Sequence, residues 1–175
     1  WRSTLRAWID GGTRFDFSWT RPNRRHVARG VILPGSIPDG LAHLVVAVDT
    51  SGSISPADLA AFESELSAAC EEGAADLVSV VYADRRIHRV DTFHAGDPVT
   101  FRPRGGGGTG FRPVMDWIRE LAPDASGVVF FTDLDVSPSG FGADPGPPVL
   151  WAACGDPRRR RSPPFGDVVE IAADA

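Results

Sequence analysis

The chain has 175 residues, a mass of 18.7 kDa and a formal net charge of −5, which suits one domain with a single core. The acidic balance argues against nucleic acid as the main partner, and no apolar run approaches the ~20 residues that a membrane span needs. All basic residues are arginine, which excludes a phosphate-binding loop that depends on lysine. Cys70 and Cys154 lie in apolar contexts and are expected to be buried free thiols, as in a cytoplasmic protein.

Two parts are expected in the chain. Residues 1–40 are predicted to form an amino-terminal extension packed on the main domain, which is expected to occupy 41–175. The first residue is Trp1 and not methionine, which leads us to expect a piece of a longer polypeptide.

The stretch that begins at residue 44 is the most informative part of the sequence. Residues 44–48 are apolar without interruption, which predicts a strand buried on both faces of a parallel sheet. Asp49, Ser51 and Ser53 follow with a spacing of two, so their oxygens can point to one side of a turn. One carboxylate and two hydroxyls beyond the end of a strand form a hard-oxygen pocket of the kind that Mg²⁺, Mn²⁺ or Ca²⁺ requires.

Buried strand patterns and helical spacings alternate along the rest of the chain. Ser55 before Pro56 predicts a helix start, with a serine cap and a proline in the first turn. The predicted elements are, in chain order, a helix over 1–10, an edge strand over 15–19, an arginine-rich loop at 21–25, turns over 35–40, a strand at 44–48, a helix over 56–72, a strand at 77–83, a hairpin strand at the sheet edge at 87–93, a loop over 94–109, a helix over 111–121, and strands at 127–132, 149–154 and 168–171. The glycine- and proline-rich stretch 134–148 has no room for a full helix.

This order predicts an α/β fold with a doubly wound, mostly parallel sheet, an antiparallel edge strand and helices on both faces. In such sheets ligands bind beyond the carboxyl ends of the strands, where the strand order reverses. Asp49 and Asp133 each follow a buried strand, and Thr109 follows four glycines and precedes a helix. We therefore expect these three side chains to approach one crevice.

This arrangement resembles the metal-ion-dependent adhesion site of von Willebrand factor type A (VWA) domains. The resemblance rests on the D-x-S-x-S loop, the loop threonine and the strand-end aspartate, in the family's order, and covers roughly 41–172. It implies a Rossmann-like fold and a bound Mg²⁺, Mn²⁺ or Ca²⁺ whose coordination an acidic residue of a partner protein completes. The implied ligands are Asp49, Ser51, Ser53, Thr109 and Asp133. The family places glycine after the last aspartate, where this chain has Leu134.

Shorter matches resemble a narrower bacterial group. The segments 18–25, 33–34 and 163–166 look like those of proteins that carry a VWA-like domain at the carboxyl end of a metallopeptidase-type chain. The resemblance implies that this segment is not an enzyme, and that any peptidase activity belongs to another domain. By association it implies a MoxR-type AAA+ ATPase as the protein partner, with neither nucleic acid nor membrane involved.

Two alternatives remain open. The first is a VWA-like scaffold with a vestigial metal site that acts only through protein contacts. The second is a dinucleotide-binding unit, because Gly105 to Gly110 satisfy G-x-G-x-x-G before a helix and Asp133 ends the next strand about twenty residues on. The preceding stretch 99–104 contains a proline and two arginines, unlike the buried strand that such a unit requires.

Overall fold

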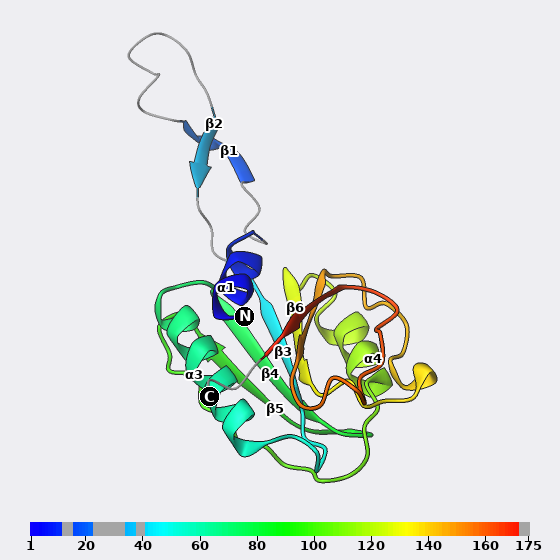
Figure 1. The fold of residues 1–175 in the computed structure, drawn as a ribbon. Helices are drawn as coiled ribbons and strands as arrows, with labels where there is room; N and C mark the ends of the chain where they lie inside the picture. Colours follow the sequence, from blue (N-terminus) through cyan, green and yellow to red (C-terminus); the bar gives the residue numbers. More distant parts are fainter. Residues whose placement is uncertain (12–15, 23–33, 38–40, 172–175) are drawn as a thin grey trace.

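The computed structural model describes residues 1–11, 16–22, 34–37 and 41–171. Its centre is a six-stranded sheet in the order β5-β4-β3-β6-β7-β8, in which every pairing is parallel except that of β4 with the edge strand β5 (Figure 1). The strands are β3 (Leu44–Asp49), β4 (Leu77–Ala83), β5 (Ile87–His94), β6 (Gly127–Thr132), β7 (Val149–Ala153) and β8 (Asp167–Glu170). Every residue of β3, β6 and β7 is buried, as expected of strands covered on both faces. The predicted fold class is confirmed.

The strand order reverses between β3 and β6. β3 pairs with β4 on one side and with β6 on the other, and Val48 lies opposite Phe131. The residues that follow these two strands therefore meet at the same edge of the sheet, which we call the carboxyl edge. It is the lower edge of the sheet in Figure 1.

Helices cover both faces of the sheet. α1 (Arg2–Gly11) and α3 (Pro56–Glu71) lie on one face, where Phe62 and Leu66 are fully buried against the strands. α4 (Arg112–Leu121) covers the other face through Val114, Met115 and Ile118. The helix predicted from Ser55 is confirmed, because the Ser55 hydroxyl accepts the Ala57 N–H at 3.2 Å.

The connection from β6 to β7 contains no α-helix. Its single helical turn is η1 (Pro138–Gly140), so the prediction that 134–148 has no room for a full crossover helix is confirmed. The layer on that side of the sheet is completed by the buried side chains of Val136 and Phe141. Helix α4 and this loop together bury the face that holds Trp151.

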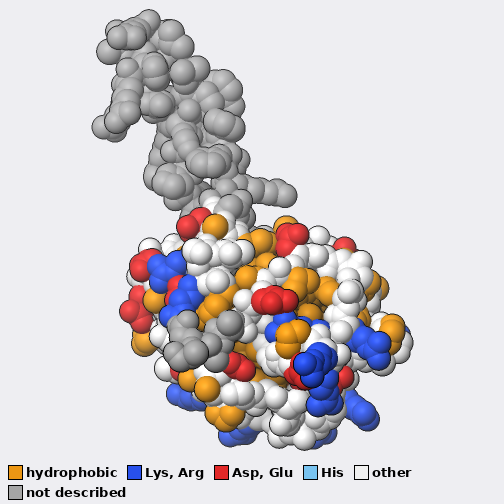
Figure 2. All heavy atoms as spheres, viewed as in Figure 1, with side chains coloured by type: hydrophobic (Ala, Val, Ile, Leu, Met, Phe, Trp, Pro, Cys, Tyr) orange, Lys and Arg blue, Asp and Glu red, His pale blue; other side chains and the backbone are white. Residues whose placement is uncertain are grey.

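The amino-terminal helix α1 is part of the core. Leu5 and Ile9 are 1% exposed, and the Arg6 guanidinium bonds to Glu65 on α3 and to Glu72, which caps the end of that helix. Basic and acidic side chains accordingly lie side by side on this part of the surface (Figure 2). The first helix therefore packs on the domain, whereas the packing predicted for the extension 1–40 as a whole stays a prediction. The predicted domain boundary at residue 41 stays a prediction.

A separate two-stranded antiparallel sheet is formed by β1 (Asp16–Pro22) and β2 (Pro34–Ile37). β1 covers most of the predicted strand at 15–19. The expectation of turns over 35–40 is wrong where β2 forms, because pairing with β1 holds that backbone extended. The predicted arginine-rich loop lies largely outside the described residues.

Two further sequence expectations concern the cysteines and the membrane. Cys70 and Cys154 are both free and buried, as predicted. Within the described part of the chain, the longest helix is α3 with 16 residues, and none has the length and apolar character to cross a membrane.

Candidate functional site

The loop after β3 gathers oxygen atoms around Asp49. The Asp49 carboxylate is 4% exposed. Its Oδ1 accepts the backbone N–H of Ser51 at 2.9 Å, and the hydroxyls of Ser51 and Ser53 lie 3.2 Å apart. Ser51 is buried and Ser53 is exposed, so the cluster reaches from the sheet to the surface. The three residues predicted from the D-x-S-x-S pattern are thus brought together.

The end of β6 supplies the other side of the cluster. The hydroxyl of Thr132, which is fully buried, donates to Asp49 Oδ2 at 2.8 Å and accepts the Leu134 N–H at 3.1 Å. Asp133 is the next residue and is 7% exposed. Its Oδ1 accepts the Asp135 N–H at 3.0 Å. The side chain of Thr132 therefore joins the two strand ends that carry the predicted aspartates.

The surroundings of Asp49 disfavour the ionised form of its carboxyl group. Burial raises the pKa of this carboxyl above its usual range, and the nearby charge of Asp133 raises it further. The hydrogen bonds from Ser51 and Thr132 oppose this effect without cancelling it. Burial also raises the pKa of the Cys154 thiol to about 12, and the charges of Asp58, Asp133 and Asp49 add to this. This corner of the molecule therefore carries several carboxylates around a poorly solvated space.

Leu134 adopts an unusual backbone conformation directly after Asp133. Its φ is 58°, in the left-handed region that favours glycine. Its side chain is 2% exposed and packs in the core on the α4 face of the sheet. The turn that a glycine would make easily is therefore kept by a residue whose burial offsets the strain. Leu134, which stands where VWA domains have glycine, therefore adopts the left-handed conformation all the same.

The glycine-rich loop 105–110 is held by a third strand-end acid, Asp84. Asp84 Oδ2 accepts the Gly107 N–H at 3.2 Å, and the Asp84 carbonyl accepts the Gly110 N–H at 3.1 Å. A Cβ on Gly105 would lie 2.1 Å from Thr50 Oγ1. The loop therefore packs against the ends of both β3 and β4.

Thr109 is half-buried on this loop. It lies between Gly108, which is close to the Arg85 side chain, and Gly110, whose N–H bonds to the Asp84 carbonyl. No hydrogen bond among the described residues joins its hydroxyl to the other four predicted ligands. The structure thus places Thr109 at the same edge of the sheet, and assembles only Asp49, Ser51, Ser53 and Asp133 into the immediate cluster.

The dinucleotide alternative does not match this loop. Residues 95–111 contain no strand, whereas the G-x-G-x-x-G unit follows directly from one. The N–H groups of Gly107 and Gly110 are already bonded to Asp84, so they are not available to a pyrophosphate.

The cluster fits a small divalent cation. Adjacent oxygens in an octahedral Mg²⁺ shell lie about 3.0 Å apart, close to the 3.2 Å between the Ser51 and Ser53 hydroxyls. Each Asp49 oxygen accepts one hydrogen bond and keeps further lone pairs. Among the described residues, no group of three or more His, Cys, Asp or Glu side chains forms a metal site. The side-chain donors that the described residues gather here are therefore two carboxylates, from Asp49 and Asp133, and neutral hydroxyls.

Sequence comparison identifies the domain. Residues 44–172 match the family described as VWA-like domain (DUF2201). The chain belongs to this VWA-like family. It is also 31% identical over 135 residues to an uncharacterized protein of Thermotoga maritima, an alignment that covers 76% of this chain and 32% of the relative. The VWA-like chain therefore spans about a third of the length of the curated relative that it matches.

Two residues of the VWA-like site were not singled out from the sequence. Thr132 precedes Asp133 at the end of a buried strand. Because side chains alternate along a strand, its side chain is expected on the other face of the sheet from that of Asp133. Asp84 follows a buried strand as Asp49 and Asp133 do, and this shared position was the available signal. Its bond to Gly107 spans 23 positions, and no local pattern encodes it.

Proposed function

We propose that this VWA-like domain binds a divalent cation at its carboxyl edge, Mg²⁺ or else Mn²⁺ or Ca²⁺, and through it a carboxylate of a partner protein. The observation that supports the proposal is the cluster of Asp49, Ser51 and Ser53 beside Asp133, in which buried carboxylates adjoin a hydroxyl pair at the spacing of an ion's neighbouring ligands. Thr109 is proposed as a fifth ligand, directly or through water.

The role of the ion follows from the charges. Without it, a partner's carboxylate approaching Asp49 and Asp133 is repelled by about 3 kcal/mol for each pair at ~6 Å and an effective dielectric of ~20. A divalent ion with an open coordination position reverses the sign, because it accepts the incoming carboxylate as a ligand. The proposed contact of this carboxylate with the site is therefore gated by metal.

The domain is proposed to act by binding and not by catalysis. Within the chain no His-Glu-x-x-His sequence is present that would hold a catalytic zinc in the usual way. A MoxR-type AAA+ ATPase is the proposed partner, and a metallopeptidase-type domain elsewhere in the longer protein is proposed to carry any enzymatic activity.

Thermal unfolding with and without metal tests the proposal. At ten times its dissociation constant, Mg²⁺ should stabilise the wild type by ~1.4 kcal/mol, or roughly 3–6 °C in melting temperature. Asp49→Ala and Ser51→Ala should lose most of this shift. Ser64→Ala, which alters an exposed serine on α3, is the matched control and should keep it.

The alternative of a vestigial site predicts a different result. A scaffold that no longer binds metal would unfold at the same temperature in Mg²⁺, Mn²⁺, Ca²⁺ and EDTA. The same shift in wild type and Asp49→Ala would place metal binding elsewhere on the protein and would sink the proposal.

A further inference from the structure

We infer that the carboxyl edge is a basic docking surface for an acidic segment of a partner protein, with arginines arranged around the candidate metal site. This inference specifies the kind of partner that the proposed metal site would bind. It depends on the proposed function only for the one carboxylate that would bind the metal ion. The surrounding contacts are made by arginines and need no metal.

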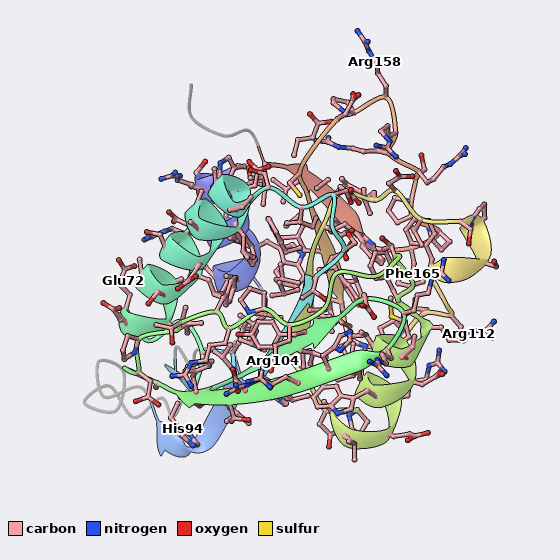
Figure 3. The ribbon with its side chains drawn as sticks, turned by 90° about the horizontal axis from the view of Figure 1, so that it is seen from below. Glu72, His94, Arg104, Arg112, Arg158 and Phe165 are labelled. Atoms are coloured by element: carbon pink, nitrogen blue, oxygen red, sulfur yellow. The ribbon has the colours of Figure 1, made fainter. Side chains whose placement is uncertain are left out.

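The arginines in question come from every loop at this edge, and we call them the arginine rim. They lie in the β4–β5 turn, in the loop before α4, at the first residue of α4 and in the loop after β7. Figure 3 looks at this edge from below, with Arg104, Arg112 and Arg158 on three separate segments. The rim consists of Arg85, Arg86, Arg102, Arg104, Arg112, Arg158, Arg159, Arg160 and Arg161.

Pairing separates the rim from the described arginines elsewhere. Away from this edge, Arg6 bonds to two glutamates, Arg89 to Asp91 and Arg119 to Asp116, and Arg2 also has an acidic neighbour in Glu65. On the rim, only two arginines have an ion pair with a described residue: Arg159 with Asp135 and Arg160 with Glu170. The other rim arginines are exposed, and their side chains form no hydrogen bond or ion pair with the described residues: Arg85, Arg86, Arg102, Arg104, Arg112, Arg158 and Arg161.

The acids of the same edge do not neutralise the rim. Asp84 is buried and held by backbone N–H groups and His88, and Asp49 and Asp133 are buried at the centre. Asp135 is already paired with Arg159. Asp156 is exposed in the loop that carries four of the nine rim arginines, where its Oδ1 accepts the Arg158 N–H at 2.9 Å. The edge therefore presents an excess of exposed positive charge on a chain whose net charge is −5. Figure 2 shows this edge from the side, with basic side chains along the lower border of the molecule.

Arginines that have no acidic partner among the described residues, arranged in such a ring, suit carboxylates. A guanidinium binds a carboxylate through two parallel N–H···O bonds, and a basic surface accelerates and orients the encounter with an acidic one. An acidic segment could place one carboxylate at the central ion and its neighbours on the rim. Arg85 already lies over Gly108, where a Cβ would be 2.8 Å from its Nε, so the rim and the loop that carries Thr109 form one surface.

A nucleic acid suits this surface less well. A phosphate backbone needs a continuous basic track, and here the ring encloses buried carboxylates. Single-stranded bases also need exposed aromatic faces on which to stack. The large apolar side chains that are exposed in the described part of the chain are Leu121 and Val168, neither of them aromatic.

Fluorescence anisotropy at low ionic strength tests the inference with two labelled probes, a peptide of alternating glutamate and glycine and an oligothymidylate of equal charge. Each is titrated with the protein in Mg²⁺ and in EDTA. The rim variant is Arg104→Gln/Arg112→Gln/Arg158→Gln. The matched control, Arg6→Gln/Arg89→Gln/Arg119→Gln, removes the same charge from paired arginines. The rim variant should bind the peptide about tenfold or more weakly than the wild type, and the control within about twofold.

The outcomes separate this inference from the metal proposal. Weaker peptide binding by the rim variant alone, in EDTA as well as in Mg²⁺, supports the docking surface even if Mg²⁺ does not change the affinity. Binding that needs Mg²⁺ but is equal in the rim variant and the control overturns the inference while leaving the metal proposal intact. Absence of peptide binding in every buffer, or tighter arginine-dependent binding of the oligothymidylate, also overturns it.

Discussion

Asp49 is the last residue of β3, and Asp84 directly follows the neighbouring parallel strand β4, one position beyond Ala83, which pairs with Asp49. The surroundings of these two acids differ. Asp84 accepts the N–H groups of Arg85, Arg86 and Gly107 and lies 2.9 Å from the His88 ring nitrogen. Burial acts to raise its pKa, but these contacts together lower the pKa below its usual value. Asp49 has fewer donors and a carboxylate neighbour, and its pKa is raised.

The difference separates a structural acid, Asp84, from Asp49, for which we propose a functional role in metal binding. The lone pairs of Asp84 are used to hold the turn and the glycine loop in place. Asp49 keeps spare coordination capacity in a poorly solvated place, which is the condition in which a cation is most useful. Destabilisation of the folded protein by the Asp49 charge is consistent with a binding role for this residue.

Gly105 lies where the two strand ends meet, and its replacement should have the largest effect. Its φ is 152°, and an added Cβ would lie 2.1 Å from Thr50 Oγ1 and 3.3 Å from Asp84 Oδ2. Gly105→Ala should lower the free energy of unfolding by ~3 kcal/mol, measured by urea denaturation.

Gly52→Ala is the matched control for this variant. Nothing lies within 4 Å of a Cβ at Gly52, so the loss there should stay within ~0.5 kcal/mol. Equal losses in the two variants would mean that the glycine loop is not packed against the ends of β3 and β4.

The second prediction separates the two aspartates in EDTA. Asp84→Asn turns an amide N–H₂ towards one of the N–H donors and should cost about 2 kcal/mol of stability. Asp49→Asn can stay satisfied, because the Thr132 hydroxyl can accept where it now donates. It also removes a buried charge, so its stability should match or exceed that of the wild type.

Chemical denaturation of both variants without metal measures this contrast. A loss of ~2 kcal/mol in Asp49→Asn as well would show that its charge is fully compensated in the folded protein. The contrast between a structural and a functional acid would then be wrong.

How far the sequence predicted these features depends on how local they are. The buried run 44–48, the Asp-x-Ser-x-Ser spacing and the strand before Asp133 are local patterns, and they predicted the strand ends and their meeting at the reversal of strand order. The left-handed turn at Leu134 has no such signal, because leucine favours other conformations. The structure supplies the reason, which is burial of that side chain.

Long-range pairing was the other limit. The pattern of 1–10 predicted the apolar face of α1, but not that Arg6 would bond to Glu65 and Glu72, 59 and 66 positions away. The same holds for the arginine rim. Its members are scattered between residues 85 and 161, and only the folded sheet brings their loops to one edge. Only the fold, likewise, shows which of them lack an acidic partner in the part of the chain that the structure describes.

The smallest effect expected is on the pH dependence of stability, where the two aspartates should act in opposite directions. The lowered pKa of Asp84 means that its charge adds stability above the unfolded-state value of ~3.9, and that this is lost as the pH falls through the folded-state pKa. The raised pKa of Asp49 means that stability present below ~3.9 is lost as the pH rises through its folded-state pKa. Urea denaturation in EDTA across this range should therefore show the disadvantage of Asp84→Asn shrinking at acidic pH, and the advantage of Asp49→Asn growing towards neutral pH. Parallel curves for both variants and the wild type would show that neither carboxyl changes its pKa on folding.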